Sequence, residues 1–492
     1  MIRAKHLARR SSSIVFLLAA GCTVGPKYQR PSVPVPAKWE VTEPWRESAP
    51  KDGLPKGEWW NVFQNEELND LEQQTLDANQ TIKVATAHVE KARASADLQI
   101  ATQFPSLSAT PSAQRQRLSG NRPANSNFPV RTPVSQTNIV LPFTVGYETD
   151  LFGRRRRSIE AAQASYQASA ADLENVRLVI TAELAGDYFT LRQLDTELGI
   201  LNRTVETLKK GLQLVDSRHR GGVASGLDVA EEETLLNTTK TQAVLLQQQR
   251  KQFEDAIAVL VGKPAPDFHL APKELNAEPP RLDAGLPSEL LERRPDIAEA
   301  ERQMAVANAQ IGIARAAYFP SLNLFANGGW QAADIAKLLN VQSTFWAVGA
   351  NAAEAIFTGG SRPAQTQFAK AGYNASVASY RDTVLNAFRE VEDDVNGLIV
   401  FDQAFHSQEQ AVDSSRRTLD IATSRYVGGL VNYLDVVNAQ QNLLNNEQEL
   451  AVIRGQRLAT SVLLIKALGG GWDASSLATV QVKTKLKDAI AP

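Results

Sequence analysis

The feature that most constrains this chain is a long internal repeat. The segment SRHRGGVASGLDV, from Ser217 to Val229, returns as SRYVGGLVNYLDV from Ser424 to Val436, and seven of the thirteen letters agree at a constant offset of 207 residues. The same offset relates further pairs, namely Glu183 and Glu390, Asp187 and Asp394, Arg250 and Arg457, and Gly262 and Gly469. Two copies of one long unit therefore make up most of the chain.

Each copy opens with an expected helix. Apolar residues and alanine predominate at heptad a and d spacing from 82 to 99 in the first copy and from 297 to 314 in the second. Small residues at such positions let helices pack closely. The helices are expected to end before the Phe-Pro pairs of QFPSL (103–107) and YFPSL (318–322), because proline disfavours helical backbone in the residue before it.

A pair of strands is expected next in each copy. TNIVLPFTVGY (137–147) alternates between apolar and small or polar residues, and the Ser-, Thr- and Gln-rich stretch 106–119 is its expected partner. Segments 320–331 and 343–357 repeat this plan in the second copy. Three aromatic residues there suit a membrane interface: Trp330, Phe345 and Trp346. A pair of soluble hairpins is the alternative interpretation.

Four strands per chain cannot close a barrel, and an open sheet edge is not tolerated in lipid. If these are membrane strands, several chains must share one barrel. Two, three or four chains would supply eight, twelve or sixteen strands, and geometry alone does not choose between them.

Long helical hairpins are expected to complete each copy. No proline occurs between Phe143 and Lys263 or between Ala364 and Ala491, and an apolar heptad seam runs from 194 to 215. Roughly 60 residues of helix would extend about 90 Å. The equivalent seam in the second copy, from 401 to 422, is more polar, which indicates a hairpin nearer to water.

The repeated glycines mark the tips of these hairpins, because glycine ends a helix in a left-handed cap. Asn432 precedes Asp435 by three residues, and Ser225 precedes Asp228 by the same spacing. This spacing is typical of a capping pair at the start of the next helix.

The amino terminus has the pattern of a secretory signal. Basic residues precede the apolar run from Ile14 to Ala20, and small residues precede Cys22. A cysteine in that place is the acceptor for diacylglyceryl modification in bacterial lipoproteins, although Leu18 stands one place earlier than usual. A signal peptide that ends near a chance cysteine is the alternative.

The composition argues against several other functions. A net charge of −2 disfavours a broad nucleic-acid surface, and Cys22, the single cysteine, excludes an internal disulfide. The five histidines are scattered, and the glycines of GGVASG (221–226) lack the Lys-Ser/Thr of a phosphate loop. We therefore expect no enzyme and no cofactor or metal beyond a covalent lipid on Cys22.

Several motifs that span nearly the whole chain carry a family resemblance. They are GCTVGPKYQRP (21–31), EWWNVF (58–63), YETDLFGRRRR (147–157), LPSELLERRPDIAEAE (286–301) and the two glycine tips. In these motifs the chain resembles the TolC-like outer membrane efflux factors, specifically the lipoprotein branch with OprM-like and nodulation protein T-like members. LPSELLERRPDI is the most specific of them.

The resemblance implies a mainly α-helical homotrimer with a shared twelve-stranded barrel in the bacterial outer membrane and a helical tunnel through the periplasm. Around the tunnel it implies a belt from the segment near 59–77, the connection 255–291 and the C-terminal tail. Such a channel passively exports small molecules, docked to a periplasmic adaptor and an inner-membrane resistance–nodulation–division pump. The alternatives are a channel for protein export (type I secretion) and a non-conducting periplasmic lipoprotein scaffold.

On this reading the chain divides into five parts. They are a signal peptide (1–21), a lipid-anchored extended leader (22–60), a first repeat (61–276, strands about 105–150, hairpin about 153–262), a second repeat (277–470, strands about 320–357, hairpin about 360–468) and a C-terminal tail (471–492). The Pro-rich part of the leader, 31–39, is expected to run down the outside of the barrel.

The resemblance also assigns candidate sites. The periplasmic gate maps onto Leu434, Asp435 and Asn438, where the OprM-like members have a carboxylate in place of Asn438; helix capping is the alternative role for Asp435. The adaptor is expected to contact six tip residues: Arg218, Gly221, Gly222, Arg425, Gly428 and Gly429. The basic run 154–157 is expected at the level of the lipid headgroups, paired with lipid phosphate or acidic neighbours.

Overall fold

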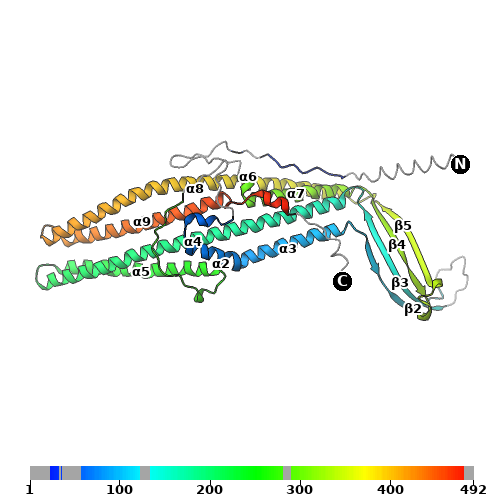
Figure 1. Cartoon of the computed structure of the whole chain (residues 1–492), viewed down its shortest axis with the longest axis horizontal. Coiled ribbons are helices and arrows are strands. Elements are labelled where there is room, and N and C mark those ends of the chain that lie inside the picture. Colours follow the sequence, from blue (N-terminus) through cyan, green and yellow to red (C-terminus); the bar gives the residue numbers. More distant parts are fainter. Residues whose placement is uncertain (1–22, 33–34, 36–56, 122–132, 281–289, 481–492) are drawn as a thin grey trace.

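The computed structural model describes residues 23–32, 35, 57–121, 133–280 and 290–480. The expected signal peptide, Cys22 and most of the C-terminal tail lie outside these residues. The described residues form an elongated helical body, with a sheet at one end and two helical hairpin tips at the other (Figure 1).

The two repeats form matching sets of helices. In the first repeat, helices of 22, 67 and 35 residues are α3 (Gln80–Ala101), α4 (Arg154–Arg220) and α5 (Gly226–Leu260). In the second repeat, helices of the same three lengths are α7 (Pro295–Ala316), α8 (Ser361–Val427) and α9 (Tyr433–Ala467). The predicted repeats and long hairpins are thereby confirmed. Within the described ranges, none of the helices combines the length and the apolarity that a membrane crossing requires.

Shorter elements connect these helices. They are η1 (Trp59–Phe63), α2 (Glu66–Ala78), η2 (Ala265–Asp267), α6 (Leu290–Arg293), η4 (Ile335–Lys337), η5 (Val341–Ser343) and η6 (Ala474–Thr479). Helix α2 packs against α4, and η4 and η5 lie in the connection between the strands of the second repeat.

The sheet is antiparallel throughout. Its strands are β1 (Ser106–Ala109), β2 (Ser112–Leu118), β3 (Val134–Thr149), β4 (Ser321–Ala332) and β5 (Thr344–Ala353). Strands β1 and β2 both pair with β3, so they are two parts of one strand position that is interrupted at Thr110 and Pro111. Proline has no N–H for the ladder, which accounts for the break. The four expected strand positions are present, with the first one divided.

The pairing register gives the sheet two different faces. Residues directly opposite each other share a face, and residues alternate between faces along each strand. One face carries mostly apolar residues: Leu107, Ala113, Ile139, Leu141, Phe143, Val145, Leu324, Ala326, Trp330, Trp346 and Val348. The other carries many polar ones: Ser106, Ser108, Gln114, Gln116, Asn138, Thr144, Asn323, Asn327, Gln331 and Asn351. Within the described residues, no other element covers the apolar face, and Trp346 on this face is 79% exposed.

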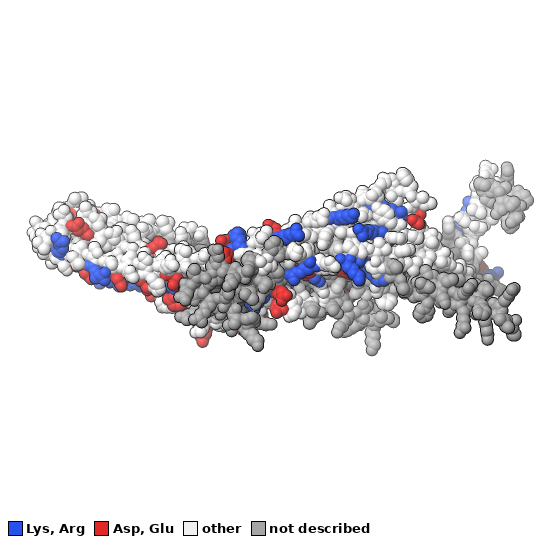
Figure 2. Space-filling view, turned by 90° about the horizontal axis from the view of Figure 1, so that it is seen from above, with Lys and Arg blue, Asp and Glu red and all other residues white. Residues whose placement is uncertain are grey.

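Charged residues are scarce in the sheet. Strands β1, β4 and β5 contain none, β3 contains only Glu148, and β2 contains Arg115 and Arg117, which lie on the same face as Ala113. Figure 2 shows one face of the molecule, on which charged side chains lie mostly over the helices and those of Lys and Arg gather on the half of the helical body nearer the sheet.

The main apolar core lies in the middle of the helical body, where Trp59, Phe189 and Tyr380 are buried together. Smaller apolar clusters continue along the hairpins toward the tips. The predicted apolar seam from 194 to 215 is buried, for example at Leu201 and Leu208. The more polar second seam, from 401 to 422, is buried at Phe405 and Val412.

The described part of the leader departs from the expectation that it runs along the barrel: Val35 of the Pro-rich part packs against the main apolar core of the helical body, while residues 33–34 and 36–56 lie outside the described residues. Residues 23–32 begin at the junction of the sheet and the helices, where Val24 N–H donates to the Phe152 carbonyl at 3.2 Å. Farther along, the Tyr28 hydroxyl bonds Glu301 of α7 at 2.6 Å, and Arg30 donates to the Tyr380 hydroxyl of α8 at 3.0 Å. These polar contacts hold residues 24–30 on the helices and on the junction.

Candidate functional site

The tips of the two helical hairpins lie at the end of the molecule opposite the sheet (Figure 1). One apolar cluster joins them, in which Val215 of α4 packs with Tyr426 of α8 and with Tyr433 and Val436 of α9. The rings of Tyr426 and Tyr433 meet edge to face, with centroids 4.9 Å apart. The predicted gate and adaptor-contact residues are therefore gathered at one place.

Both long helices end at their paired glycines in the same way. Gly222 and Gly429 have φ of +75° and +73°, a left-handed backbone that glycine adopts without strain. The closing hydrogen bonds run from Val223 N–H to the Arg218 carbonyl and from Leu430 N–H to the Arg425 carbonyl. This is the Schellman arrangement. The predicted helix ends are confirmed, while contact with an adaptor stays a prediction.

The helices that follow the tips begin differently. Ser225 and Asp228 form the predicted capping box, with Ser225 Oγ accepting from Asp228 N–H at 3.2 Å. Asn432 has the extended backbone of an N-cap, but its side chain accepts no capping hydrogen bond. Asp435 N–H donates instead to the backbone carbonyl of Asn432 at 3.2 Å. The predicted side-chain cap at Asn432 and Asp435 is therefore wrong, because a backbone turn satisfies this N–H.

The predicted gate residues share the exposed face of α9. Leu434, Asp435 and Asn438 are exposed, whereas Tyr433 and Val436 turn into the apolar cluster between the tips. Within the described residues, the Asp435 carboxylate has no hydrogen bond or ion pair. The role of this face as a gate stays a prediction.

The two tip arginines have different surroundings although their positions are equivalent. The Arg218 guanidinium lies 5.0 Å from the centre of the Tyr426 ring and so links the first tip to the second by a cation–π contact. The residue equivalent to Tyr426 in the first repeat is His219, whose Nδ1 lies 2.9 Å from the Ala224 carbonyl of its own tip. Arg425 is exposed and has no such aromatic partner in the described part of the chain.

Sequence reasoning missed Glu232 and its surroundings. Glu232 of α5 is fully buried against Gly211 of α4, beside the hydroxyl of Tyr433. Burial raises the pKa of Glu232 to about 7. The repeat held a signal for this contact, because the equivalent positions in the second copy are Ala439 and Thr418. A carboxylate faces a glycine in the first copy only.

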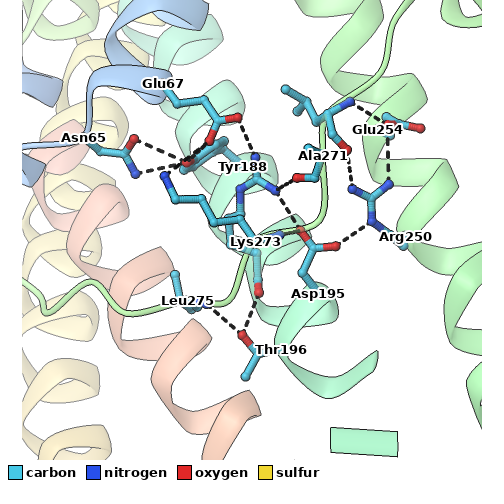
Figure 3. A network of polar contacts seen from close by, with 12 residues as sticks. Asn65, Glu67, Tyr188, Asp195, Thr196, Arg250, Glu254, Ala271, Lys273 and Leu275 are labelled. Carbon is cyan, nitrogen blue, oxygen red and sulfur yellow. Dashed lines mark hydrogen bonds and ion pairs between the residues drawn. The ribbon is translucent and has the colours of Figure 1, made fainter. Parts of the chain in front are cut away.

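A second polar site lies in the middle of the helical body, centred on Asp195 of α4 (Figure 3). Its carboxylate, 1% exposed, pairs with Arg192 at 2.7 Å and with Arg250 of α5 at 2.6 Å. It also accepts from Lys273 N–H at 3.1 Å. Arg192 reaches onward to Glu67 of α2 at 2.8 Å. One buried carboxylate thus ties α2, α4, α5 and the connection that follows α5.

This network fixes the connection between the repeats to both hairpins. Leu275 N–H donates to Thr196 Oγ1 at 2.8 Å on the first hairpin, and Glu278 pairs with Arg457 of α9 at 3.1 Å on the second. Arg457 also pairs with Asp402 at 2.6 Å, just as Arg250 pairs with Asp195. The two ion pairs are related by the offset of 207, so the repeated arginine joins the two helices of each hairpin.

The basic run at the start of α4 has acidic neighbours, as predicted. Its ion pairs are Arg154 and Arg155 with Glu148 at 2.7 and 3.2 Å, Arg156 with Asp150 at 3.1 Å, and Arg157 with Glu160 at 2.7 Å. Arg157 also donates to the Pro26 carbonyl at 2.9 Å, which joins the leader to this junction. Contact with lipid phosphate stays a prediction. Across the described residues, no three His, Cys, Asp or Glu side chains gather as a metal ion would require.

Both repeats match one family model. Residues 71–263 and 286–470 fit the model described as "Outer membrane efflux protein". The chain belongs to the outer membrane efflux protein family. This membership confirms the family resemblance of the sequence motifs and the outer membrane as the location of the protein.

Curated members of the family align with nearly the whole chain. The toluene efflux pump outer membrane protein TtgC of Pseudomonas putida is 32% identical over 464 residues, which cover 94% of this chain and 95% of that protein. The pyoverdine export outer membrane protein OpmQ of Pseudomonas aeruginosa is 32% identical over 466 residues, covering 93% and 96%. The solved structure of the outer-membrane channel OprN is similar with a TM-score of 0.85 and 30% identity, and the match covers 92% of this chain and all of OprN.

The most specific family motif has a structural role in this efflux protein. Arg294, which is buried, pairs with Asp296 and with Glu390 of α8, both at 2.7 Å. It also donates to the carbonyl of Ala467 at the end of α9. The motif therefore holds the start of α7 against both helices of the second hairpin.

Proposed function

We propose that the chain is the outer membrane channel of a three-component efflux system. As a homotrimer it forms a passive conduit through which small molecules leave the periplasm or cytoplasm for the exterior. A periplasmic adaptor and an inner-membrane resistance–nodulation–division pump dock to it and supply the energy. In this proposal the channel itself performs no chemistry.

The two-faced sheet carries the proposal. Its apolar face suits lipid, and its polar face suits a water-filled lumen. The strand position of β1 and β2 and the strand β5 form the two edges of the sheet, with hydrogen-bonding groups that have no partner strand among the described residues. Lipid does not tolerate such edges, so neighbouring chains must cover them. Three chains would supply twelve strand positions.

The candidate sites take their places within this assembly. Leu434, Asp435 and Asn438 would narrow the periplasmic entrance as they meet their copies around the axis. The six tip residues, among them Arg218 and Arg425, would contact the adaptor. Cys22 would carry the N-terminal lipid that anchors the chain in the outer membrane.

Small-molecule efflux is favoured over protein export by the relatives, two of which are described as toluene and pyoverdine exporters. The alternative of a non-conducting scaffold leaves the polar face of the sheet without a role.

Single-channel recording in a planar bilayer tests the proposal. The purified, lipidated protein should form oligomers with a low, cation-preferring conductance. A folded oligomer that never conducts, even when the gate residue Asp435 is replaced by alanine, would favour the scaffold. Mass spectrometry of the mature N-terminus tests acylation of Cys22 independently.

A further inference from the structure

We propose that Glu232 is a gate-positioning residue that, through Tyr433, holds the start of α9 against the first hairpin and releases it when Glu232 loses its proton. This proposal rests on the proposed channel function, because the segment that it controls carries the candidate gate. It assigns a role to a side chain that lies outside the gate and adaptor-contact residues.

The placement of Glu232 is the first argument. Its side chain is fully buried, and among the described residues its carboxylate has one polar neighbour, the Tyr433 hydroxyl, to which the contact falls short of ideal hydrogen-bond geometry. A β-carbon added at Gly211 would collide with Glu232 Oε1 and approach the Tyr433 hydroxyl to 3.4 Å. Glycine at 211 thus provides the space in which the carboxyl group of α5 meets the hydroxyl group of α9.

The charges around Glu232 are the second argument. Helix α4 presents Gly211 to the carboxyl group, α9 presents the Tyr433 hydroxyl, and the nearby cluster contributes leucine and valine side chains. Asp228 of α5 and Arg218 of α4 face the tyrosine rings rather than Glu232. In the described part of the chain, no cation pairs with this carboxylate. Burial, the larger effect, raises the pKa of Glu232 and outweighs the contact with the Tyr433 hydroxyl, which lowers it, so the neutral form is favoured.

Proximity to the candidate gate is the third argument. Tyr433 is the first residue of α9 and directly precedes Leu434 and Asp435. A buried carboxylate that ionises without a cation gains stability by becoming hydrated. Hydration requires Glu232 to separate from Gly211 and Tyr433, which would move the first turn of α9 and the gate residues on it.

The pH dependence has a definite sign. Burial raises the pKa of Glu232 from its ordinary value of 4.5 to about 7. Glu232 therefore binds its proton more tightly in the packed arrangement than in the hydrated one. The packed arrangement is fully favoured at low pH. Its advantage is lost as the pH rises from about 4.5 through about 7. The channel should accordingly open more readily at pH 8 than at pH 5.5.

We call the contact of Glu232 with Tyr433 the latch. Bilayer conductance of the full-length trimer between pH 5.5 and 8.5 tests it. Wild type should conduct several-fold more at the upper end, and Glu232→Gln should stay at the low level throughout because its amide cannot ionise. Glu233→Gln is the matched control, since it removes an exposed carboxylate from the same helical turn. Asp394 and Glu299 also have pKa values raised to about 7 by burial, so the difference between wild type and Glu232→Gln is decisive.

Thermal unfolding keeps the latch distinguishable from the channel function. Glu232→Gln should match wild type at pH 5.5 and melt at a higher temperature at pH 8, whether or not the protein conducts. A wild-type pH profile in Glu232→Gln, in both conductance and melting, would overturn the latch. Oligomers that show the melting difference but never conduct would overturn the channel function and the gating role that rests on it.

Discussion

At the scale of single residues, the tips show how two copies of one motif diverge. The Asp228 carboxylate closes a capping box, whereas the carboxylate of Asp435, its equivalent, is exposed with no hydrogen-bonding or charged partner in the described residues. Arg218 packs on Tyr426, whereas Arg425 is exposed. The first copy of each residue stabilises the tip, and the second remains free for contacts with other chains.

This divergence predicts that two matched substitutions change different properties, one the stability of the tip and the other the conductance. Asp228→Ala should lower the stability of the tip by about 0.5–1 kcal/mol, because it removes the carboxylate that accepts from Ser225 N–H in the capping box and a negative charge from the first turn of α5. Asp435→Ala should leave the melting temperature unchanged and should raise the bilayer conductance, because it removes a carboxylate from the predicted entrance ring. Equal conductance in wild type and Asp435→Ala would contradict a gating role for this residue.

The ion pairs at the middle of the body provide a second matched test. Asp195→Asn leaves Arg192 and Arg250 without their buried carboxylate, and removing one partner of a buried ion pair costs about 3–5 kcal/mol. Asp402→Asn should cost less, about 1 kcal/mol, because the Asp402 side chain is 38% exposed to water. Chemical denaturation of the two variants measures the difference, and equal losses would show that burial does not control the strength of these pairs.

Sequence reasoning predicted best those residues that belong to local patterns. The glycine ends and the Ser225–Asp228 box depend on neighbours within a few positions, so the letters alone predict them. The contacts of Glu232 with Gly211 and Tyr433 join three helices, and no local pattern specifies which helices meet. The side-chain cap at Asn432 failed for a related reason, because the backbone of this turn closes the hydrogen bond that the side chain was expected to make.

At the scale of the elements, equal helix lengths in the two repeats place the two tips at the same level. The long helices contain 67 residues in each repeat, and the returning helices contain 35. Glycines bound the long helices, at 153 and 221 in the first repeat and at 360 and 428 in the second, which is why the sequence predicted the hairpins well. The path of the described leader residues was predicted wrongly, because the partners that hold them, such as Glu301 and Tyr380, lie in the second repeat.

Substitutions at the paired glycines test how each hairpin is terminated. Gly222→Ala and Gly429→Ala should each cost about 1–2 kcal/mol, because these residues have positive φ and alanine is strained there. Gly221→Ala and Gly428→Ala are the matched controls, since their φ values of −80° and −75° suit any residue. Melting temperatures of the four variants measure the effect. A loss of stability in the controls as large as in the test variants would contradict the Schellman arrangement as the cause.

At the scale of the whole molecule, the sheet is the part that a single chain leaves incomplete. Its apolar face is exposed, and both of its edge strand positions lack a partner strand within the described residues. Alternation in the sequence predicted the strands and their apolar face, but it could not choose between two, three or four chains. That choice depends on how strands of different chains tilt and pair, which no single sequence records.

Disulfide trapping tests the shared barrel directly. A cysteine in β2 and a cysteine in β5 of the same chain are separated by three strand spacings, about 14 Å, which exceeds the reach of a disulfide. Cysteines scanned along 112–118, each combined with Trp346→Cys, should therefore form only bonds between chains and yield a covalent species of three chains. The control pair Thr144→Cys and Asn327→Cys, which are opposite each other in β3 and β4, should bond within one chain and yield monomers. A ladder that closes at two or four chains would exclude the trimer, and the absence of bonds between chains across the scan would exclude the shared barrel.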